Sequence, residues 1–130
     1  MPRLMSVALT ADAVIERRKT VTRRRGWLML KPGDLLTLCR KVQGRKPGEP
    51  LERLAQVEVV SVRREPLWHL VQTKSMYGRA EVVREGCPGM DPFTFVVQYF
   101  IRPQRMRWTD EVTRIEWRYL DAAATSSKES

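Results

Sequence analysis

The segment RRKTVTRRR, from Arg17 to Arg25, is the most informative stretch of this 130-residue chain. It places six cations within nine residues, interrupted only by Thr20, Val21 and Thr22. Such a dense run repels itself unless anions lie close to it. Guanidinium and hydroxyl groups are also donors that hold a phosphate or a polar base. A solvated charged loop is the alternative interpretation of the same run.

The residues around this run predict short strands and helices. Residues 4–10 are mostly apolar and predict a strand, and Thr10 is a good N-cap for a helix over residues 11–18. Residues 19–26 are then expected to form a basic loop. A Pro-Gly-Asp turn precedes a predicted strand over residues 35–42, and residues 43–53 are expected to be an exposed loop.

The second half of the chain continues the same mixture. Residues 54–64 predict a strand with a β-bulge, because the apolar phase switches at Val60. A helical turn over 66–71 and a helix over 75–85 follow. Asp91-Pro92 then predicts the start of an amphipathic helix that ends before Pro103, with a buried face of Phe93, Val96, Val97 and Phe100 and with Phe95 also in the core. Residues 112–120 alternate, which predicts a closing strand with Arg114 on its polar face.

These elements predict an α+β fold with a small curved or closed sheet. The length fits one domain, expected to span residues 1–121, with a disordered tail over 122–130. Apolar residues make up 42% of the chain and its longest apolar runs are short, so a membrane span, a secreted disulfide scaffold and a fibrous repeat are excluded. We expect a cytoplasmic protein, by default a monomer.

The charge composition favours a polyanionic or nucleotide partner. The net charge is +9, and 18 arginines stand against 6 lysines. Arginine grips phosphate and stacks on bases, although an arginine-rich genome would give the same bias. The chain has one histidine and two cysteines without paired spacing, so it offers no zinc ligand set. No metal and no cofactor are expected.

The segment Arg17–Arg24 resembles the GxKxxTxR signature of the ASCH domains, a branch of the PUA-like proteins. Lys19, Thr22 and Arg24 take the lysine, threonine and arginine positions, and Arg17 takes the glycine position. The resemblance extends to the strand after Pro-Gly-Asp and to REGCPGMDPFTFVVQYF at 84–100, and covers most of residues 4–120.

The resemblance implies a small mixed β-barrel with helices packed at its mouth. It also implies binding of RNA or modified nucleosides, and similarity to small metal-independent amidohydrolases that act on N4-acylated cytidine. Carried over by position, the catalytic residues would be Lys19, Thr22 and Glu85, with Glu81 as the alternative to Glu85.

The chemistry of this trio can be argued from the residues. Thr22 needs a neighbour to take its proton, and Lys19 can do so only as the neutral amine. Five nearby arginines and burial would lower the pKa of Lys19. An ion pair with Glu85 would raise it, so we expect Glu85 to move a proton or to hold the leaving nitrogen, and not to pair tightly with Lys19. Arg24 could stabilise an oxyanion.

Two other functions remain open at this point. A non-catalytic RNA-binding module would use the basic run together with aromatic side chains that stack on bases. The residues expected to contact substrate or nucleic acid are Arg17, Arg18, Arg23, Arg24, Arg25, Tyr77 and Trp108. The resemblance also implies a ribonuclease as an alternative function, since some ASCH relatives are linked to that activity, for which a lysine with Tyr77 and Ser75 could suffice. The single histidine, His69, is expected to have a packing or capping role.

Overall fold

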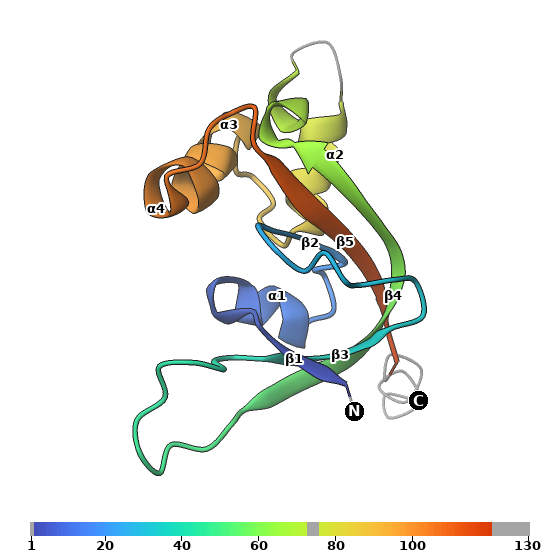
Figure 1. The fold of residues 1–130 in the computed structure, drawn as a ribbon, viewed down its shortest axis with the longest axis vertical. Coiled ribbons are helices and arrows are strands. Elements are labelled where there is room, and N and C mark those ends of the chain that lie inside the picture. The colour runs from blue at the N-terminus through green and yellow to red at the C-terminus, as the bar shows by residue number, and fades with distance from the viewer. Residues whose placement is uncertain (1, 73–75, 121–130) are drawn as a thin grey trace.

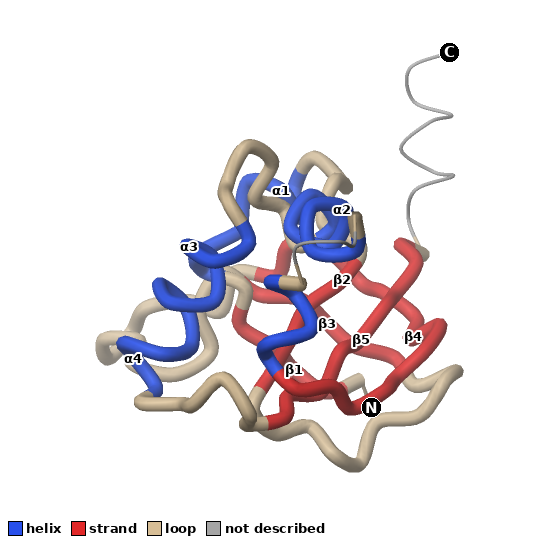
Figure 2. Tube along the Cα trace, turned by 90° about the horizontal axis from the view of Figure 1, so that it is seen from above, coloured by secondary structure: helices blue, strands red, loops and turns tan. Residues whose placement is uncertain are grey.

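Five strands form one mixed sheet in the computed structural model, which describes residues 2–72 and 76–120. The strand order is β1-β3-β4-β5-β2. β1 (Arg3–Ser6) pairs parallel with β3 (Leu35–Cys39), and every other pairing, through β4 (Arg53–Pro66), β5 (Glu111–Tyr119) and β2 (Val21–Arg24), is antiparallel. The sheet curls into a half-barrel (Figures 1 and 2), which confirms the predicted α+β class and mixed sheet.

Short helices occupy the inside and one end of this curl. α1 (Ala11–Ile15) lies within the curve of the sheet (Figure 1). α2 (Tyr77–Arg84), α3 (Pro92–Val96) and α4 (Arg102–Gln104) lie at the end where β4 finishes and β5 begins. In the described part of the chain, no helix combines the length and apolar character needed to cross a bilayer.

Part of the basic run forms a strand, β2, where the sequence predicted a loop. β2 pairs with β5, and Arg23 lies directly opposite Arg114 in the register. Arg114 is itself 4% exposed, although the alternation of its strand placed it on the polar face. Charge made both residues appear solvent-exposed in the sequence, but carboxylates from other elements lie against them. The prediction of a loop over 19–26 was therefore wrong for residues 21–24, whereas 19–20 and 25–26 lie outside any helix or strand.

The helix after Asp91 begins as predicted and continues differently. The carboxylate of Asp91 accepts a hydrogen bond from the Thr94 amide at 3.2 Å, with Pro92 in the first turn. A π-helical turn, Val97–Ile101, then follows α3. Phe95, Val96 and Phe100 are buried as predicted, whereas Phe93 is 57% exposed, so its assignment to the buried face was wrong. Pro103 does not end the segment, because it lies in the first turn of α4.

Other boundaries moved by a few residues. The first strand ends at Ser6 and the first helix at Ile15, and Thr10 precedes that helix without a side-chain capping bond. The bulge in β4 is confirmed by a register shift between Val59 and Ser61, and the predicted helical turn is present as a 3-10 segment, Leu67–Val71. Ser75 and the predicted disordered tail lie outside the described residues.

Two hydrophobic clusters stabilise the two ends of the molecule. One lies inside the sheet and includes Val14, Leu38, Val57 and Trp117. The other lies under the helices. Its buried members are Leu67, Leu70, Val82, Phe95, Val96, Phe100, Met106 and Val112. Along β4 and β5, the charged residues Glu65 and Arg114 lie in the sequence between the members of the two clusters, so a polar layer separates them.

Gly86 sets how closely the end of α2 approaches α1. Its φ is +91°, and a Cβ there would lie 2.6 Å from Ala13 Cβ and 3.4 Å from Lys19 Cβ. Gly89 also has a positive φ, of +86°, but a Cβ there would meet nothing within 4 Å. The two glycines therefore share the backbone cost of an added side chain and differ in the steric cost.

We predict that Gly89→Ala lowers the free energy of unfolding by about 1–2 kcal/mol, the cost of a left-handed residue with a Cβ. Gly86→Ala should lower it by clearly more, because α1 and Lys19 must also move. Urea denaturation followed by circular dichroism measures both. Equal losses would contradict the close packing of Gly86 on Ala13.

Candidate functional site

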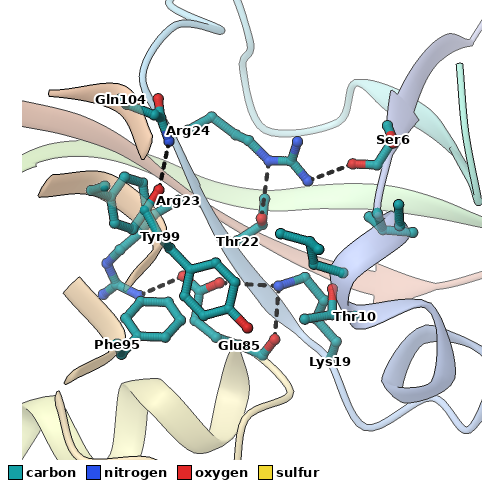
Figure 3. A pocket seen from close by; sticks show the side chains of 14 residues that line it. Ser6, Thr10, Lys19, Thr22, Arg23, Arg24, Glu85, Phe95, Tyr99 and Gln104 are labelled. Carbon is teal, nitrogen blue, oxygen red and sulfur yellow. Dashed lines mark hydrogen bonds and ion pairs between the residues drawn. The ribbon is translucent and has the colours of Figure 1, made fainter. Parts of the chain in front are cut away.

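A cavity of about 260 Å³ opens between β2, the π-helical segment and the 3-10 turn Ala8–Thr10 that precedes α1. Its polar lining includes Lys19, Thr22, Arg24 and Glu85. Figure 3 shows the Lys19 ammonium, the Thr22 hydroxyl and the Glu85 carboxylate facing the same space. The fold thus brings the predicted Lys/Thr segment and Glu85 to one cavity, although they are far apart in sequence. Glu81 does not line this cavity.

Lys19 is held at both ends. Its side chain is 3% exposed, and Nζ donates to the backbone oxygen of Glu85 at 2.8 Å and to Glu85 Oε1 at 3.0 Å. Its own carbonyl accepts from Trp117 Nε1 at 3.0 Å and from the Tyr119 hydroxyl. The expectation that Glu85 avoids a tight ion pair with Lys19 was wrong, because burial leaves the ammonium and the carboxylate better satisfied by each other than by water.

The pKa of Lys19 is nevertheless lowered. Burial is the largest cause, because it disfavours the charged ammonium. Glu85 raises this pKa through its charge and its hydrogen bond, and Arg24 lowers it through like charge. The net direction agrees with the prediction, and burial contributes more than the neighbouring cations.

Thr22 and Arg24 form a second pair on the same wall. Arg24 Nε donates to Thr22 Oγ1 at 3.1 Å, and Arg24 Nη2 donates to the Ser6 carbonyl at 2.8 Å. A hydroxyl oxygen that accepts from a cation can still donate its own proton, and the nearby charge stabilises the alkoxide left behind. Arg24 is therefore placed to make Thr22 more acidic.

Behind the cavity, Arg23 lies at the centre of a buried ion network. Its side chain is fully buried, with Nε 2.9 Å from Glu65 Oε2 and Nη1 3.0 Å from Glu85 Oε2. Nη2 contacts Glu81 Oε1 and also donates to the Tyr77 hydroxyl at 3.1 Å. Glu81, also fully buried, accepts in addition from Arg114 and Arg84.

The buried charges of this region balance. Three cations and three carboxylates are buried among the described residues, namely Lys19, Arg23, Arg114, Glu65, Glu81 and Glu85. Arg24 is additional to this set, and the bonds described above join it to uncharged oxygens. The cavity wall therefore carries a guanidinium whose charge is not compensated by a bonded carboxylate, next to Thr22.

Aromatic side chains form the opposite wall. Phe95, Tyr99 and Phe100 line the cavity, and the Phe95 and Tyr99 rings lie 5.0 Å apart, tilted by 51°. The π turn places them there, since Tyr99 and Phe100 belong to it. A planar ligand could pack against this wall while its polar edge faces Lys19 and Thr22.

Comparison with known proteins identifies the fold. No family model and no curated protein matches the sequence. The solved structure of an ASCH domain from Lactobacillus crispatus JV V101 matches over 85% of this chain and 70% of its own, at 16% identity and a TM-score of 0.53. The fold is that of an ASCH domain. The hypothetical protein PH0355 matches over 92% of this chain and 97% of its own, at 14% identity and a TM-score of 0.55. EF3133 from Enterococcus faecalis V583, of family DUF984, matches over 92% of this chain and 80% of its own, at 13% identity and a TM-score of 0.58.

Within this ASCH fold, Arg17 at the glycine position of the motif adopts a left-handed backbone conformation. Arg17 has a φ of +63°, a region that glycine adopts readily. Its guanidinium donates to the Val14 carbonyl at 2.9 Å and lies 5.0 Å from the centre of the Tyr119 ring. The hydrogen bond to Val14 and the cation–π contact with Tyr119 offset part of the free-energy cost of this backbone conformation.

The other residues expected to contact substrate lie outside the cavity. Arg18 pairs with Glu16 at the surface, and Arg25 is exposed. The Tyr77 hydroxyl donates to Glu65 Oε1 at 2.5 Å, so it belongs to the ion network. The Trp108 ring stacks on Phe93 at 5.2 Å. These four do not line the cavity, whereas Arg23 and Arg24 do.

Sequence reasoning missed the contributions of Glu65, Tyr99 and Arg114. Glu65 is the penultimate residue of the long strand β4, and Arg114 alternates with apolar residues on β5, so both appeared to be surface residues. One signal was available in the sequence. If the basic run pairs as a strand inside the fold, its buried cations need glutamates from elsewhere in the chain to compensate their charge. Tyr99 was missed because the π turn changes which residues of the segment face inward.

We predict that Glu81 makes the stability of the protein sensitive to acid. Burial alone would raise its pKa, but Arg114, Arg23 and Arg84 outweigh burial and lower it from 4.5 to about 2. The ionised carboxylate of Glu81 therefore contributes fully to the free energy of unfolding above pH 4.5, and this contribution is lost as the pH falls toward about 2. Glu81→Gln should cost about 3–5 kcal/mol at pH 7, because it leaves buried guanidinium charge uncompensated. Urea denaturation at pH 7 and pH 3 measures both effects.

An exposed glutamate is the matched control for that variant. Glu52→Gln removes one carboxylate from a surface pair with Arg40 and should change stability by less than about 1 kcal/mol. The assignment is wrong if the Glu81 variant loses no more stability than the Glu52 variant, or if its pH dependence matches that of the parent.

Proposed function

We propose that this protein is a metal-independent amidohydrolase that removes the acyl group from an acylated pyrimidine nucleoside of the N4-acetylcytidine type. The observation that carries the proposal is the gathering of Lys19, Thr22, Arg24 and Glu85 on one cavity. A threonine nucleophile, a lysine base and a guanidinium beside them are the groups that acyl transfer requires. The choice of substrate follows the motif resemblance and the aromatic wall, against which a planar base could pack.

The first step follows from the positions of these groups. Neutral Lys19 takes the proton of the Thr22 hydroxyl, and the Thr22 oxygen bonds to the acyl carbon. The carbonyl electron pair moves to oxygen, where Arg24 stabilises the negative charge. Glu85 holds the Lys19 ammonium that forms. Collapse of the intermediate breaks the carbon–nitrogen bond as Lys19 returns its proton to the leaving nitrogen.

The second step regenerates Thr22. Water loses a proton to Lys19 and attacks the ester on Thr22. A carboxylic acid leaves, and Thr22 recovers its proton from Lys19. The sum is one water consumed per amide cleaved. A general base works best when its pKa is near the working pH, which is the direction in which burial moves Lys19.

The basic run gives less support to an RNA-binding module than its sequence suggested. Lys19 and Arg23 are buried against glutamates of the same chain, so these two cations are not available to phosphates. The net charge of +9 keeps RNA binding as the alternative outcome of the test. A ribonuclease based on Lys19 and Tyr77 lacks support, because the Tyr77 hydroxyl bonds Glu65 and Arg23 outside the cavity.

The deciding experiment measures cytidine released from N4-acetylcytidine by chromatography. We expect the parent protein to release it, and Thr22→Ala to lose at least about a thousandfold in kcat. Lys19→Met should lose about a hundredfold to ten-thousandfold, as for removal of a general base. The kcat of the parent should fall as the pH drops through the lowered pKa of Lys19, because the ammonium is not a base.

Thr20→Ala is the matched control, since Thr20 lies two residues away and does not line the cavity. Circular dichroism would verify that each variant folds. A Thr22 variant as active as the parent would remove the nucleophile assignment. Binding of a structured RNA by a parent protein that releases no cytidine would favour the binding module instead.

We predict a separate effect for the aromatic wall. Tyr99→Leu should raise KM about tenfold with a smaller change in kcat, because stacking on a base is worth about 1–3 kcal/mol. Phe93→Leu, an exposed aromatic outside the cavity, should leave KM unchanged. Steady-state kinetics on N4-acetylcytidine compares the two. Equal KM values would show that the substrate does not pack on Tyr99.

A further inference from the structure

Arg23, at the centre of the ion network, also contacts Glu85, the carboxylate that holds Lys19. The two oxygens of Glu85 are divided: Oε1 accepts from Lys19 Nζ at 3.0 Å, and Oε2 accepts from Arg23 Nη1 at 3.0 Å. The remaining donors of Arg23 are bound by Glu65, Glu81 and Tyr77, which fix the guanidinium from the other side. One carboxylate thus serves two cations at once.

We propose that Arg23 is a positioning residue that occupies one oxygen of Glu85 and thereby allows Lys19 to give up its proton and act as a base. This inference rests on the proposed function and goes beyond it, because it assigns control of the base to a residue that is not needed for any bond change. The side chain of Arg23 is fully buried, and its ion pair with Glu85 connects it to the carboxylate that holds Lys19.

The charge balance gives the direction of the effect. With Arg23 present, three buried cations face three buried carboxylates. Without its charge, Lys19 and Arg114 alone would face all three, and Glu85 would be free to give both oxygens to Lys19. Loss of the Lys19 proton would then leave an even larger uncompensated negative charge in a region of low dielectric constant. Lys19 would therefore remain an ammonium to higher pH.

The surroundings of Lys19 leave Arg23 as a distinct influence. The titratable groups that act directly on Lys19 are Glu85 after α2, Arg24 on β2 and Cys87 in the following loop. Glu85 and Cys87 favour the ammonium, and Arg24 disfavours it. Arg24 contacts Thr22 and Ser6 rather than Glu85, so it cannot replace Arg23 on the second carboxylate oxygen.

A purely structural role for Arg23 makes a different prediction. If Arg23 only stabilised the fold, its removal would lower stability and leave the titration of Lys19 unchanged in the folded fraction. The two roles are separated by a variant on the far side of the guanidinium. Glu65→Gln removes a carboxylate that competes with Glu85 for Arg23, so it should shift Lys19 in the opposite direction to Arg23→Gln.

The test follows the side-chain carbon and nitrogen resonances of Lys19 by NMR in lysine-labelled full-length protein. The chain has six lysines, and Lys19→Met identifies the Lys19 signal. We expect Arg23→Gln to raise the titration midpoint of Lys19 by a unit or more, a tenfold change in its proton affinity. Glu65→Gln should lower the midpoint, and Arg23→Lys should partly restore the parent value. Arg107→Gln, an exposed surface change, should not move it.

The pH at which kcat for N4-acetylcytidine hydrolysis falls on the acid side should move in each variant with the titration midpoint of Lys19. If Arg23→Gln does not fold, the downward shift in Glu65→Gln carries the test. Unchanged Lys19 midpoints in the folded variants would overturn the inference. Shifted midpoints in a protein that releases no cytidine would support the inference about Lys19 and refute the proposed hydrolase.

Discussion

The ion pairs made by Arg23 with three glutamates are the interaction on which this structure depends. A buried guanidinium is tolerated only when its donors and its charge are satisfied, and the partners here come from β4, from α2 and from the residue after α2. Those elements must therefore converge on β2. The same requirement places Arg114 of β5 against Glu81. The polar layer between the two hydrophobic clusters is thus a constraint on the relative positions of sheet and helices.

This constraint also fixes one wall of the cavity. Once Glu85 is held by Arg23, its other oxygen and its backbone carbonyl fix the Lys19 ammonium. Thr22 precedes Arg23 on β2 and so projects to the opposite side of the strand pleat from Arg23. Gly86 allows Ala13 of α1 and the side chain of Lys19 to lie close to the backbone that follows Glu85. Lys19, Arg23 and Glu85 belong to the ion network and also line the cavity, so the network fixes this part of the cavity wall.

Much of the architecture was predictable because local signals were strong. The bulge at Val60, the cap at Asp91 and the strand after Pro-Gly-Asp depend on neighbouring residues, and all three are present in the structure. The motif also indicated that Lys19 and Thr22 belong with Glu85. The errors concern β2 and the helical segment after Asp91. Charge in a strand appears solvent-exposed until its partners are known, and a π turn shifts a helical face without an obvious sequence signal.

The sequence by itself determined the α+β class, the motif residues and the excess of positive charge, because composition and short-range spacing are properties of the chain alone. Only the tertiary structure decided which cations are buried, that Glu85 and not Glu81 faces the cavity, and that Lys19 pairs with a carboxylate 66 residues away. The physical reason is that desolvation and charge compensation depend on which groups meet in space. The sequence does not distinguish a glutamate whose carboxylate lies in water from one that lies against a buried guanidinium.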